Sequence, residues 1–474
     1  MTRKNSLILG IICLLFLLSR LINLTSLPVF GDEAIYVRWS QIIKSVDTLR
    51  FIPLTDGKQP LFMWFNAITL RFFADPLLAG RLISVVAGLG TTILLYLISG
   101  TLLPSLLYLF LPLAFFFDRL ATADNLLSFF GLFSLYLSIK LSQHPRWDLS
   151  MLLGAVLGLA WLTKSPAIYF IVLSLATFLF LNPKNIKKIY FPLLSALIAF
   201  VIYNLLRLGP QFGQIALRNL DYVWPLTEVL KHPFDPFLPH LRDTINIFSY
   251  YLSWPLLLSP LLYLFFRKKI KLDRSSLLYL AWFLLPLIAN AAIAKVYTAR
   301  YILFTLPPLL LLLSYFLKPL FTKKYFWLLI LLFIPNLWSL YQISFHPRDL
   351  KLPSTESGYV FDWTSGWGIK EASDYLILRS KEANVIVGTE GYFGTLPDGL
   401  QIYTNNISHL TVFGVGINIT EIPEKLIDAK NHGDEVYLLF NASRLKLSSI
   451  DTAKLTLVKS VPKPDGDALL LYRL

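Results

Sequence analysis

Long apolar runs separated by short polar loops occupy most of the chain, up to about residue 345. Several runs of roughly 17–22 residues carry almost no charge, and a helix of that length crosses the hydrocarbon core of a bilayer. The pattern therefore predicts about eleven membrane-spanning helices. We expect them at 6–24, 78–98, 101–117, 125–142, 149–163, 165–181, 189–206, 244–266, 277–293, 301–317 and 325–344.

A different pattern begins near residue 350, where charge rises and apolar runs shorten to strand length. Strands alternating with helix-like stretches are typical of an α/β domain. The expected fold class is a polytopic α-helical membrane protein with a small C-terminal α/β domain, divided into residues 1–345 and 346–474. The predicted strands are 384–388, 400–403, 435–440, 455–458 and 468–473, and the predicted helices are 370–380 and 422–429.

The segment 25–77 is too polar to span a bilayer and too apolar for a free loop. Its apolar residues recur at helical spacing over 33–44 and 61–73, and such helices lie in the membrane interface. We therefore expect interfacial helices within 32–73. A plain tether between the first two spans is the alternative.

Composition and charge fit the same class of protein. Hydrophobic residues make up 55% of the chain and charged residues 15%, against about a quarter charged in soluble proteins. The net charge of +14 would suggest nucleic acid as a partner of a soluble protein, but 15 of the 43 Lys and Arg lie in short loops on one side of the predicted spans. That side should be cytoplasmic. The residues are Arg3, Lys4, Lys140, Arg146, Lys184, Lys187, Lys188, Arg267, Lys268, Lys269, Lys271, Arg274, Lys318, Lys323 and Lys324.

This topology predicts a multi-pass protein of the cell membrane, with a cytoplasmic N-terminus and an extracytoplasmic C-terminal domain. The first apolar run is long and no small-x-small cleavage site follows it, so we expect it to be retained as a span. Cys13 is the single cysteine, which excludes an internal disulfide and a cysteine-based metal site.

Two adjacent carboxylates, Asp32 and Glu33, follow the first span in the segment GDEAIYVRW. A carboxylate at the membrane surface accepts a proton from a hydroxyl group or holds a cation. The alternative is helix capping, since an acid in the first turn of a helix is favourable. Tyr36 lies one helical turn further on and is a supporting candidate.

Lysines at two outer positions are candidates for binding phosphate. Lys58 precedes Pro60, which opens the second interfacial helix, and a cation beside a helix N-terminus at headgroup level suits a phosphate group. Attraction to lipid headgroups explains Lys58 equally well. Lys164, in the segment GLAWLTKSP, needs a partner such as Asp118, Asp124 or a phosphate, and we favour a structural ion pair.

Two outer turns carry further charges. Asp118 and Asp124 lie with one Arg in a turn between spans, where charges are costly unless they are paired or functional. Lys295, Arg300 and Tyr301 form a cationic rim suited to phosphate, because Arg binds two phosphate oxygens at once. Interfacial anchoring by Tyr and Arg is the alternative.

Neither a cofactor nor a metal ion is indicated. The six histidines lack paired metal spacing, and the chain contains no Walker loop, GxSxG or HExxH motif. A divalent cation held by Asp32, Glu33 and Asp124 is the one metal site that the acids would allow.

The order of these motifs resembles that of the GT-C membrane glycosyltransferases. The similarity covers roughly residues 10–320 and is greatest to the bacterial dolichyl-phosphate-mannose–protein mannosyltransferase and aminoarabinose transferase-like group. Its motifs are GDEAIYVRW, KQPLF, GRLISVVAG with Arg81, an acidic outer turn, GLAWLTKSP and ARYILFTLPPLLLL.

This resemblance implies an inverting transfer of a sugar, a mannose-like hexose or modified pentose, from a polyprenyl-phosphate donor to a protein, lipid or glycan hydroxyl. Asp32 would be the base, and Asp124 would orient the acceptor or a neighbouring base. Lys58 and Arg300, with Lys295 and Tyr301, would hold the leaving phosphate, with Tyr36, Arg81, Asp118 and Lys164 in support. Gln59 stands where the family usually has the first of two prolines.

Two other functions compete with this one. A transporter or flippase of lipid-linked sugars would place charges near the midplane at broken helices, whereas here they lie mainly at the ends of spans. A membrane scaffold with an outer binding domain would not need the acidic and basic turns to converge.

Overall fold

The computed structural model describes residues 3–183, 186–266, 272–320, 326–447 and 452–474. Seven basic loop residues used to predict the topology lie outside these ranges: Lys184, Arg267, Lys268, Lys269, Lys271, Lys323 and Lys324. The chain forms two compact units. The helical unit comprises Met1–Leu24, Thr48–Phe65 and Arg81–Tyr341, and the sheet unit comprises Thr25–Asp47, Asn66–Gly80 and Gln342–Leu474.

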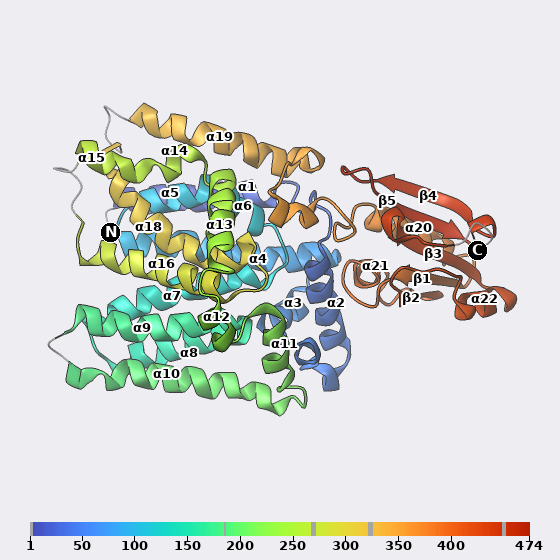
Figure 1. Cartoon of the computed structure of the whole chain (residues 1–474), viewed down its shortest axis with the longest axis horizontal. Coiled ribbons are helices and arrows are strands. Elements are labelled where there is room, and N and C mark those ends of the chain that lie inside the picture. Colours follow the sequence, from blue (N-terminus) through green and yellow to red (C-terminus); the bar gives the residue numbers. More distant parts are fainter. Residues whose placement is uncertain (1–2, 184–185, 267–271, 321–325, 448–451) are drawn as a thin grey trace. The chain divides into compact units, whose positions relative to one another are not determined.

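Long apolar helices make up the helical unit (Figure 1). Among the described residues, six helical segments are long and apolar enough to cross a membrane, and two apolar helices are shorter. The six are Arg3–Leu21 (α1), Pro76–Ser99 (α4), Ala123–Gln143 (α7), Ile186–Leu208, Arg274–Ile293 (α16) and Ala299–Leu320. The segment Ile186–Leu208 contains α10 (Tyr190–Tyr203), and the segment Ala299–Leu320 contains α17 (Ala299–Ile302) and α18 (Leu306–Leu317). The two shorter apolar helices are α8 (Trp147–Thr163) and α9 (Ile168–Leu181), the latter counted with the turn before it.

Two predicted spans are broken helices. The span expected at 101–117 is α5 (Leu103–Phe110) followed by α6 (Pro112–Phe117). The span expected at 244–266 begins earlier, as α13 (Phe237–Tyr251), and continues as α14 (Trp254–Leu257) and α15 (Leu262–Phe266). Prolines explain both corrections, because proline has no N–H to continue a helix. They are Pro112, Pro255 and Pro260.

The remaining helices connect these elements. The proline-rich segment 207–243, between the predicted spans 189–206 and 244–266, contains α11 (Gln214–Tyr222), α12 (Leu226–Lys231) and the start of α13. The helices expected within 32–73 are present as α2 (Gly31–Ser45) and α3 (Leu61–Thr69), and α19 (Phe326–Phe345) completes the helical part of the chain.

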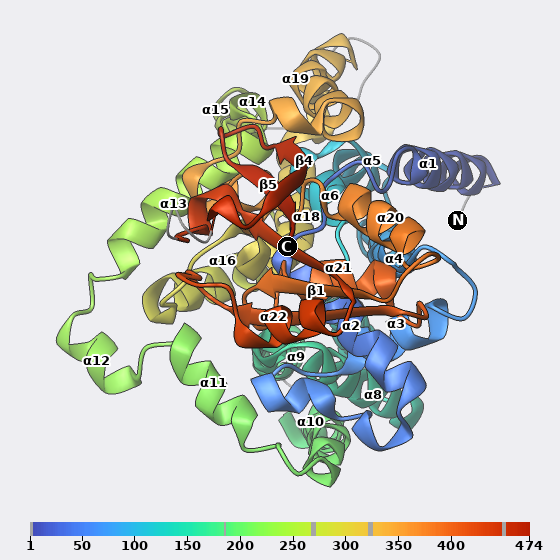
Figure 2. The ribbon, with the colours of Figure 1, turned by 90° about the vertical axis from the view of Figure 1, so that its right-hand side faces the viewer.

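The sheet unit contains one mixed five-stranded sheet, in the order β2-β1-β3-β5-β4 (Figure 1), and Figure 2 shows β1, β4 and β5 from another side. β1 (Val385–Glu390) pairs in parallel with β2 (Leu410–Gly416) and β3 (Glu435–Asn441). β5 (Ala468–Arg473) runs antiparallel to both β3 and β4 (Thr456–Pro462). The helices of this unit are α20 (Ile369–Arg379), α21 (Asp398–Thr404) and α22 (Glu424–Asn431), together with α2, which contacts α21.

One predicted strand is wrong and one strand was not predicted. Residues 400–403, expected as a strand, belong to α21. No strand was predicted at the position of β2. A short apolar run has the same local signal in a buried strand and in a buried helix. Leu400 and Ile402 are buried, and α21 packs against α2 and α20. The predicted strands at 384–388, 435–440, 455–458 and 468–473 correspond to β1, β3, β4 and β5.

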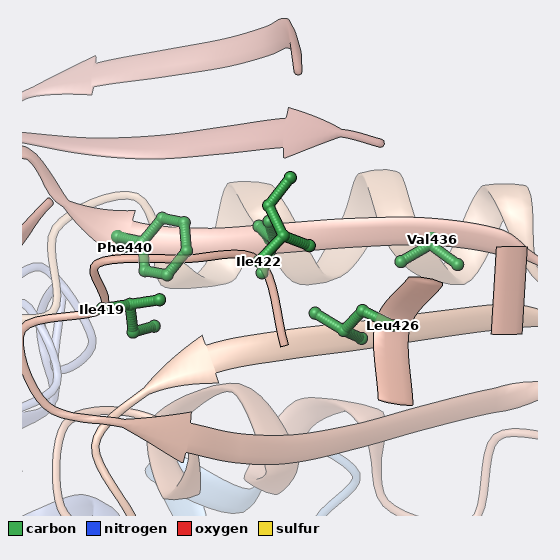
Figure 3. Close-up of a cluster of buried hydrophobic side chains, with 6 residues drawn as sticks. Ile419, Ile422, Leu426, Val436 and Phe440 are labelled. Atoms are coloured by element: carbon green, nitrogen blue, oxygen red, sulfur yellow. The ribbon is translucent and has the colours of Figure 1, made fainter. Parts of the chain in front are cut away.

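A compact apolar cluster supports one part of the sheet (Figure 3). Leu426 of α22 lies beside Val436 of β3, and Phe440 at the other end of the cluster lies near Ile419 from the segment before α22, with Ile422 between them. Burying a side chain of this size contributes about 1.5–3 kcal/mol before entropy is counted. The cluster therefore anchors α22 to the sheet.

Candidate functional site

Four cationic side chains on the helical unit are linked through shared acids and aromatic rings. They come from the segment before α3, the turn after α8, the middle of α11 and the first turn of α17. We call this group the cationic cluster. Its members are Lys58, Lys164, Arg218 and Arg300.

Lys164 lies directly after α8 and is paired with an acid at the start of α7. Its Nζ is 2.5 Å from Oδ1 of Asp124, whose side chain is only 3% exposed. Asp124 is in the first turn of α7, where the helix dipole favours a carboxylate. The ion pair favoured from the sequence is thus present, and Asp118 is not the partner. The ammonium also lies 4.5 Å from the centre of the Tyr301 ring.

Tyr301 has two cations beside its ring. Nη2 of Arg300 donates a hydrogen bond to the Tyr301 hydroxyl at 3.1 Å, and the guanidinium is 4.9 Å from the ring centre. The Tyr301 carbonyl accepts from Nδ2 of Asn290, and Tyr169 in turn donates to Oδ1 of Asn290. Hydrogen bonds from Tyr169 of α9 through Asn290 of α16 therefore fix the position of the turn that contains Arg300.

Lys58 is oriented by an acid two residues before it. Its Nζ is 2.7 Å from Oδ2 of Asp56, and the other Asp56 oxygen is 3.2 Å from Nε of Arg218 on α11. The Arg218 guanidinium lies 5.7 Å from the centre of the Tyr222 ring, and that ring lies 6.4 Å from the ring of Tyr301. The two halves of the cationic cluster are therefore joined through aromatic side chains.

Gln59, which replaces a proline usual in the similar family, has a defined partner. Its Nε2 donates to Oγ of Ser165 at 2.7 Å, and that Oγ is 3.3 Å from Oδ1 of Asn219 on α11. The amide thus attaches the segment containing Lys58 to the turn containing Lys164. A side-chain hydrogen bond does here what a rigid proline could do by restricting φ.

Gly57 lets this segment approach α11. Its φ is +65°, and a Cβ there would lie 2.5 Å from Cβ of Arg218 and 2.8 Å from the Gln214 carbonyl oxygen. We expect Gly57→Ala to destabilise the protein by about 1–3 kcal/mol, because strain at positive φ adds to the clash. Thermal unfolding in detergent would measure the loss.

Gly213→Ala is the matched control, because this residue caps α11 at φ −60° and no atom lies within 4 Å of the added Cβ. Equal behaviour of the two variants would contradict the requirement for glycine at 57.

Lys295 contacts the end of α11 and not an acidic side chain. Its Nζ donates to the Leu220 carbonyl at 2.5 Å and lies 4.6 Å from the centre of the Trp224 ring, and its backbone N–H donates to the Tyr222 carbonyl. Carbonyls of the last helical turn lack partners within the helix. A lysine there also suits the helix dipole. Lys295 therefore caps the helix that carries Arg218.

The three residues predicted on α2 differ in exposure. Glu33 is fully buried, and its Oε2 accepts a hydrogen bond from the Phe30 backbone N–H at 3.1 Å, which is the capping role considered as an alternative. Tyr36 is also buried. Asp32, in the same first turn, remains half-buried. Of the two adjacent acids, Asp32 is therefore the one that keeps contact with solvent.

Asp118 and Arg81 form interactions inside the helical unit. Asp118 is fully buried, with its carboxylate 3.1 Å from Nε of Arg20, 2.9 Å from the Tyr108 hydroxyl and 2.7 Å from Nδ2 of Asn125. Its ion-pair partner comes from α1 rather than from its own turn. Such an arrangement satisfies a buried carboxylate and indicates a structural role.

Two buried arginines satisfy the carbonyls after α1. Arg119 donates to the carbonyls of Arg20 and Ile22 at 2.9 and 2.7 Å, and Arg81 donates to that of Leu24 at 2.9 Å. The last carbonyls of a helix need such donors. These arginines hold the chain where it leaves the first span.

Reading the sequence missed Arg218, Asp56 and Asn219. Asp56 lies only two residues before Lys58, and this short spacing was a signal that the two side chains could pair. Arg218 lies in the nine-residue helix α11, between two predicted spans, and a helix-length segment was the available signal there. No group of three His, Cys, Asp or Glu residues that could hold a metal occurs in the ranges that the structure describes.

Comparison with known proteins gives a consistent result. The family model described as dolichyl-phosphate-mannose-protein mannosyltransferase matches residues 57–206. No curated protein matches the chain by sequence. Two solved structures of ArnT from Cupriavidus metallidurans each match 99% of this chain and 98% of theirs. The apo structure is 12% identical with a TM-score of 0.62, and the structure bound to undecaprenyl phosphate is 13% identical with a TM-score of 0.57.

The family match includes Lys58, Asp124 and Lys164, and the structural matches extend over both units. The chain is an integral membrane protein with the GT-C fold of ArnT, and over residues 57–206 it is similar to the dolichyl-phosphate-mannose-protein mannosyltransferases.

Proposed function

We propose that this chain is a membrane glycosyltransferase that takes a sugar from a polyprenyl-phosphate donor and transfers it, with inversion, to an acceptor hydroxyl. The observation that carries the proposal is the cationic cluster. A lipid phosphate is the leaving group of this reaction, and cations placed in advance stabilise the charge that develops on it. One of the two similar ArnT structures is bound to undecaprenyl phosphate.

The members of the cationic cluster have separate roles in the proposal. Arg300 offers a guanidinium that can bind two phosphate oxygens at once, and Lys58 offers a point charge. Lys164 is already paired with Asp124, so we assign it and Tyr301 to holding the shape of the site. Arg218 orients Lys58 through Asp56.

Asp32 is proposed as the base. Its carboxylate takes the proton of the acceptor hydroxyl, the acceptor oxygen forms a bond to the anomeric carbon, and the bond from that carbon to the phosphate oxygen breaks. Polyprenyl phosphate then leaves as an anion with the electron pair of the broken bond. Asp32 suits this role better than Glu33, because Glu33 is buried and accepts the Phe30 N–H.

The placement of the charges favours an enzyme over a transporter. Lys164 follows the last residue of α8, Asp124 lies in the first turn of α7, and Arg300 lies in the first turn of α17. A transport pathway would instead use charged groups near the middle of the membrane. The basic loops support a cytoplasmic N-terminus and an extracytoplasmic sheet unit, because basic loops are retained in the cytoplasm.

The test is a transfer assay with purified protein in nanodiscs. A panel of radiolabelled polyprenyl-phosphate hexoses and pentoses is supplied, with and without a cell-envelope extract as the source of acceptor. We expect one donor to release polyprenyl phosphate and to label the extract. Failure of every donor to release polyprenyl phosphate in the presence of extract would overturn the proposal.

A further inference from the structure

We propose that a polar pocket in the sheet unit binds the carbohydrate part of the acceptor. This inference rests on the proposed function and adds the class of acceptor. The pocket has a volume of about 680 Å³, within the range of about 300–1,000 Å³ typical of small-molecule sites. We call it the amide pocket, after the three amides among its lining residues Gln41, Lys44, Lys370, Tyr403, Asn405 and Asn406.

The amides of this pocket are oriented by neighbouring groups. Nη1 of Arg38 donates to Oδ1 of Asn405 at 2.7 Å and to Oε1 of Gln41 at 3.3 Å. Nε2 of Gln41 donates to the Ile402 carbonyl at 2.8 Å. Within the described part of the chain, Nδ2 of Asn405 has no acceptor. With its oxygen held by Arg38, Asn405 therefore offers its N–H groups to a ligand.

The charges on the wall of the amide pocket already have partners. Lys370 pairs with Asp374, and its ammonium lies 5.3 Å from the centre of the Tyr403 ring. Lys44 donates to the Leu70 carbonyl at 2.9 Å, and Oδ1 of Asp75 accepts the backbone N–H groups at the start of α4. The pocket thus differs from the cationic cluster, where a phosphate is the fitting ligand.

An uncharged ligand with many hydroxyl groups matches this lining. Each hydroxyl both donates and accepts, so it can accept an N–H of Asn405, and the Asn406 amide carries both a donor and an acceptor. The Tyr403 ring supplies an apolar surface against which the C–H face of a sugar can pack. Carbohydrate is the chemical class that combines these two needs.

Helix α2 connects the amide pocket with the proposed base. Asp32 lies in the first turn of α2, and Gln41 and Lys44 lie in its last turns. Gln41 lies nine positions after Asp32, which corresponds to about 14 Å along the helix at 1.5 Å per residue. A short extended glycan can span that length. At 3.6 residues per turn Gln41 and Asp32 lie on opposite sides of α2, so a glycan held in the amide pocket reaches Asp32 by passing around the helix.

Blocking the amide pocket tests the inference. Ala74 lines the pocket and is exposed, so Ala74→Trp places an indole in it. The assay uses the active donor with two acceptor preparations from the cell envelope, a water-soluble glycan fraction and a lipid-extracted glycan fraction. We expect the variant to raise the acceptor KM at least tenfold, with an unchanged donor KM and unchanged slow release of polyprenyl phosphate to water.

Two further variants complete the test. Ala442→Trp is the matched control, because Ala442 is an exposed alanine of the same unit outside the pocket lining, and it should match wild type. Asn406→Gly removes one amide while tolerating φ +62°, and should raise the acceptor KM severalfold.

The fraction that accepts sugar shows whether the glycan is soluble or lipid-linked. An unchanged acceptor KM in Ala74→Trp and Asn406→Gly would overturn the amide pocket, as would a wild-type protein that releases polyprenyl phosphate but glycosylates neither fraction. Loss of release with every donor would instead contradict the proposed glycosyltransferase.

Discussion

Asp32→Asn is expected to reduce transfer at least 10²–10⁴-fold, the range lost when a general base is removed. The amide keeps the size of the side chain and cannot take the acceptor proton. Asn is also well tolerated near a helix N-terminus, so α2 should still form. Release of polyprenyl phosphate from the active donor, followed over time in nanodiscs, measures the loss, and a separate titration should show that donor binding is retained.

Glu33→Gln distinguishes the two adjacent acids. Gln preserves an oxygen that can accept the Phe30 N–H, because a capping box functions with either Glu or Gln. We expect this variant to fold normally and to keep its transfer rate within a few fold of wild type. Normal turnover in Asp32→Asn would refute the assignment of the base, and a large loss confined to Glu33→Gln would move that role to Glu33.

Arg300→Ala is expected to weaken donor binding by about 10–100-fold, because a hydrogen bond to a charged group contributes about 1.5–3 kcal/mol. The guanidinium is positioned by the Tyr301 hydroxyl, whose backbone carbonyl is held by Asn290. Removing the side chain should leave that scaffold in place. The donor KM and direct binding of polyprenyl phosphate without sugar are the two measurements.

Arg300→Lys and Lys295→Ala serve as comparisons. Lys keeps the charge and loses the paired contact to two oxygens, so we expect an intermediate loss of affinity. Lys295 donates to the Leu220 carbonyl at the end of α11, so Lys295→Ala should affect stability more than donor KM. Equal donor affinity in Arg300→Ala and wild type would remove Arg300 from the phosphate site.

The sequence by itself predicted the lengths of several helices and the acidic residues in their first turns. A run of about twenty apolar residues predicts a membrane-spanning helix whatever the helix packs against. The predicted spans at 6–24, 78–98, 125–142 and 277–293 coincide closely with α1, α4, α7 and α16. Helix capping also depends only on neighbouring residues. The sequence alone therefore suggested both roles of Asp32 and Glu33, as a proton acceptor and as a helix cap. The positions of Lys58, Lys164 and Arg300 at element ends were also visible.

Tertiary structure alone decided which charges are paired. Asp118 pairs with Arg20, 98 positions earlier, and Asp56 reaches Arg218 on a helix that its proline-rich surroundings concealed. It also decided that residues 400–403 form a helix, since a run of four residues is too short to show a distinguishing period. Helix length and end signals depend on neighbours along the chain, whereas ion-pair partners, helix breaks and pockets depend on which distant segments fold against one another.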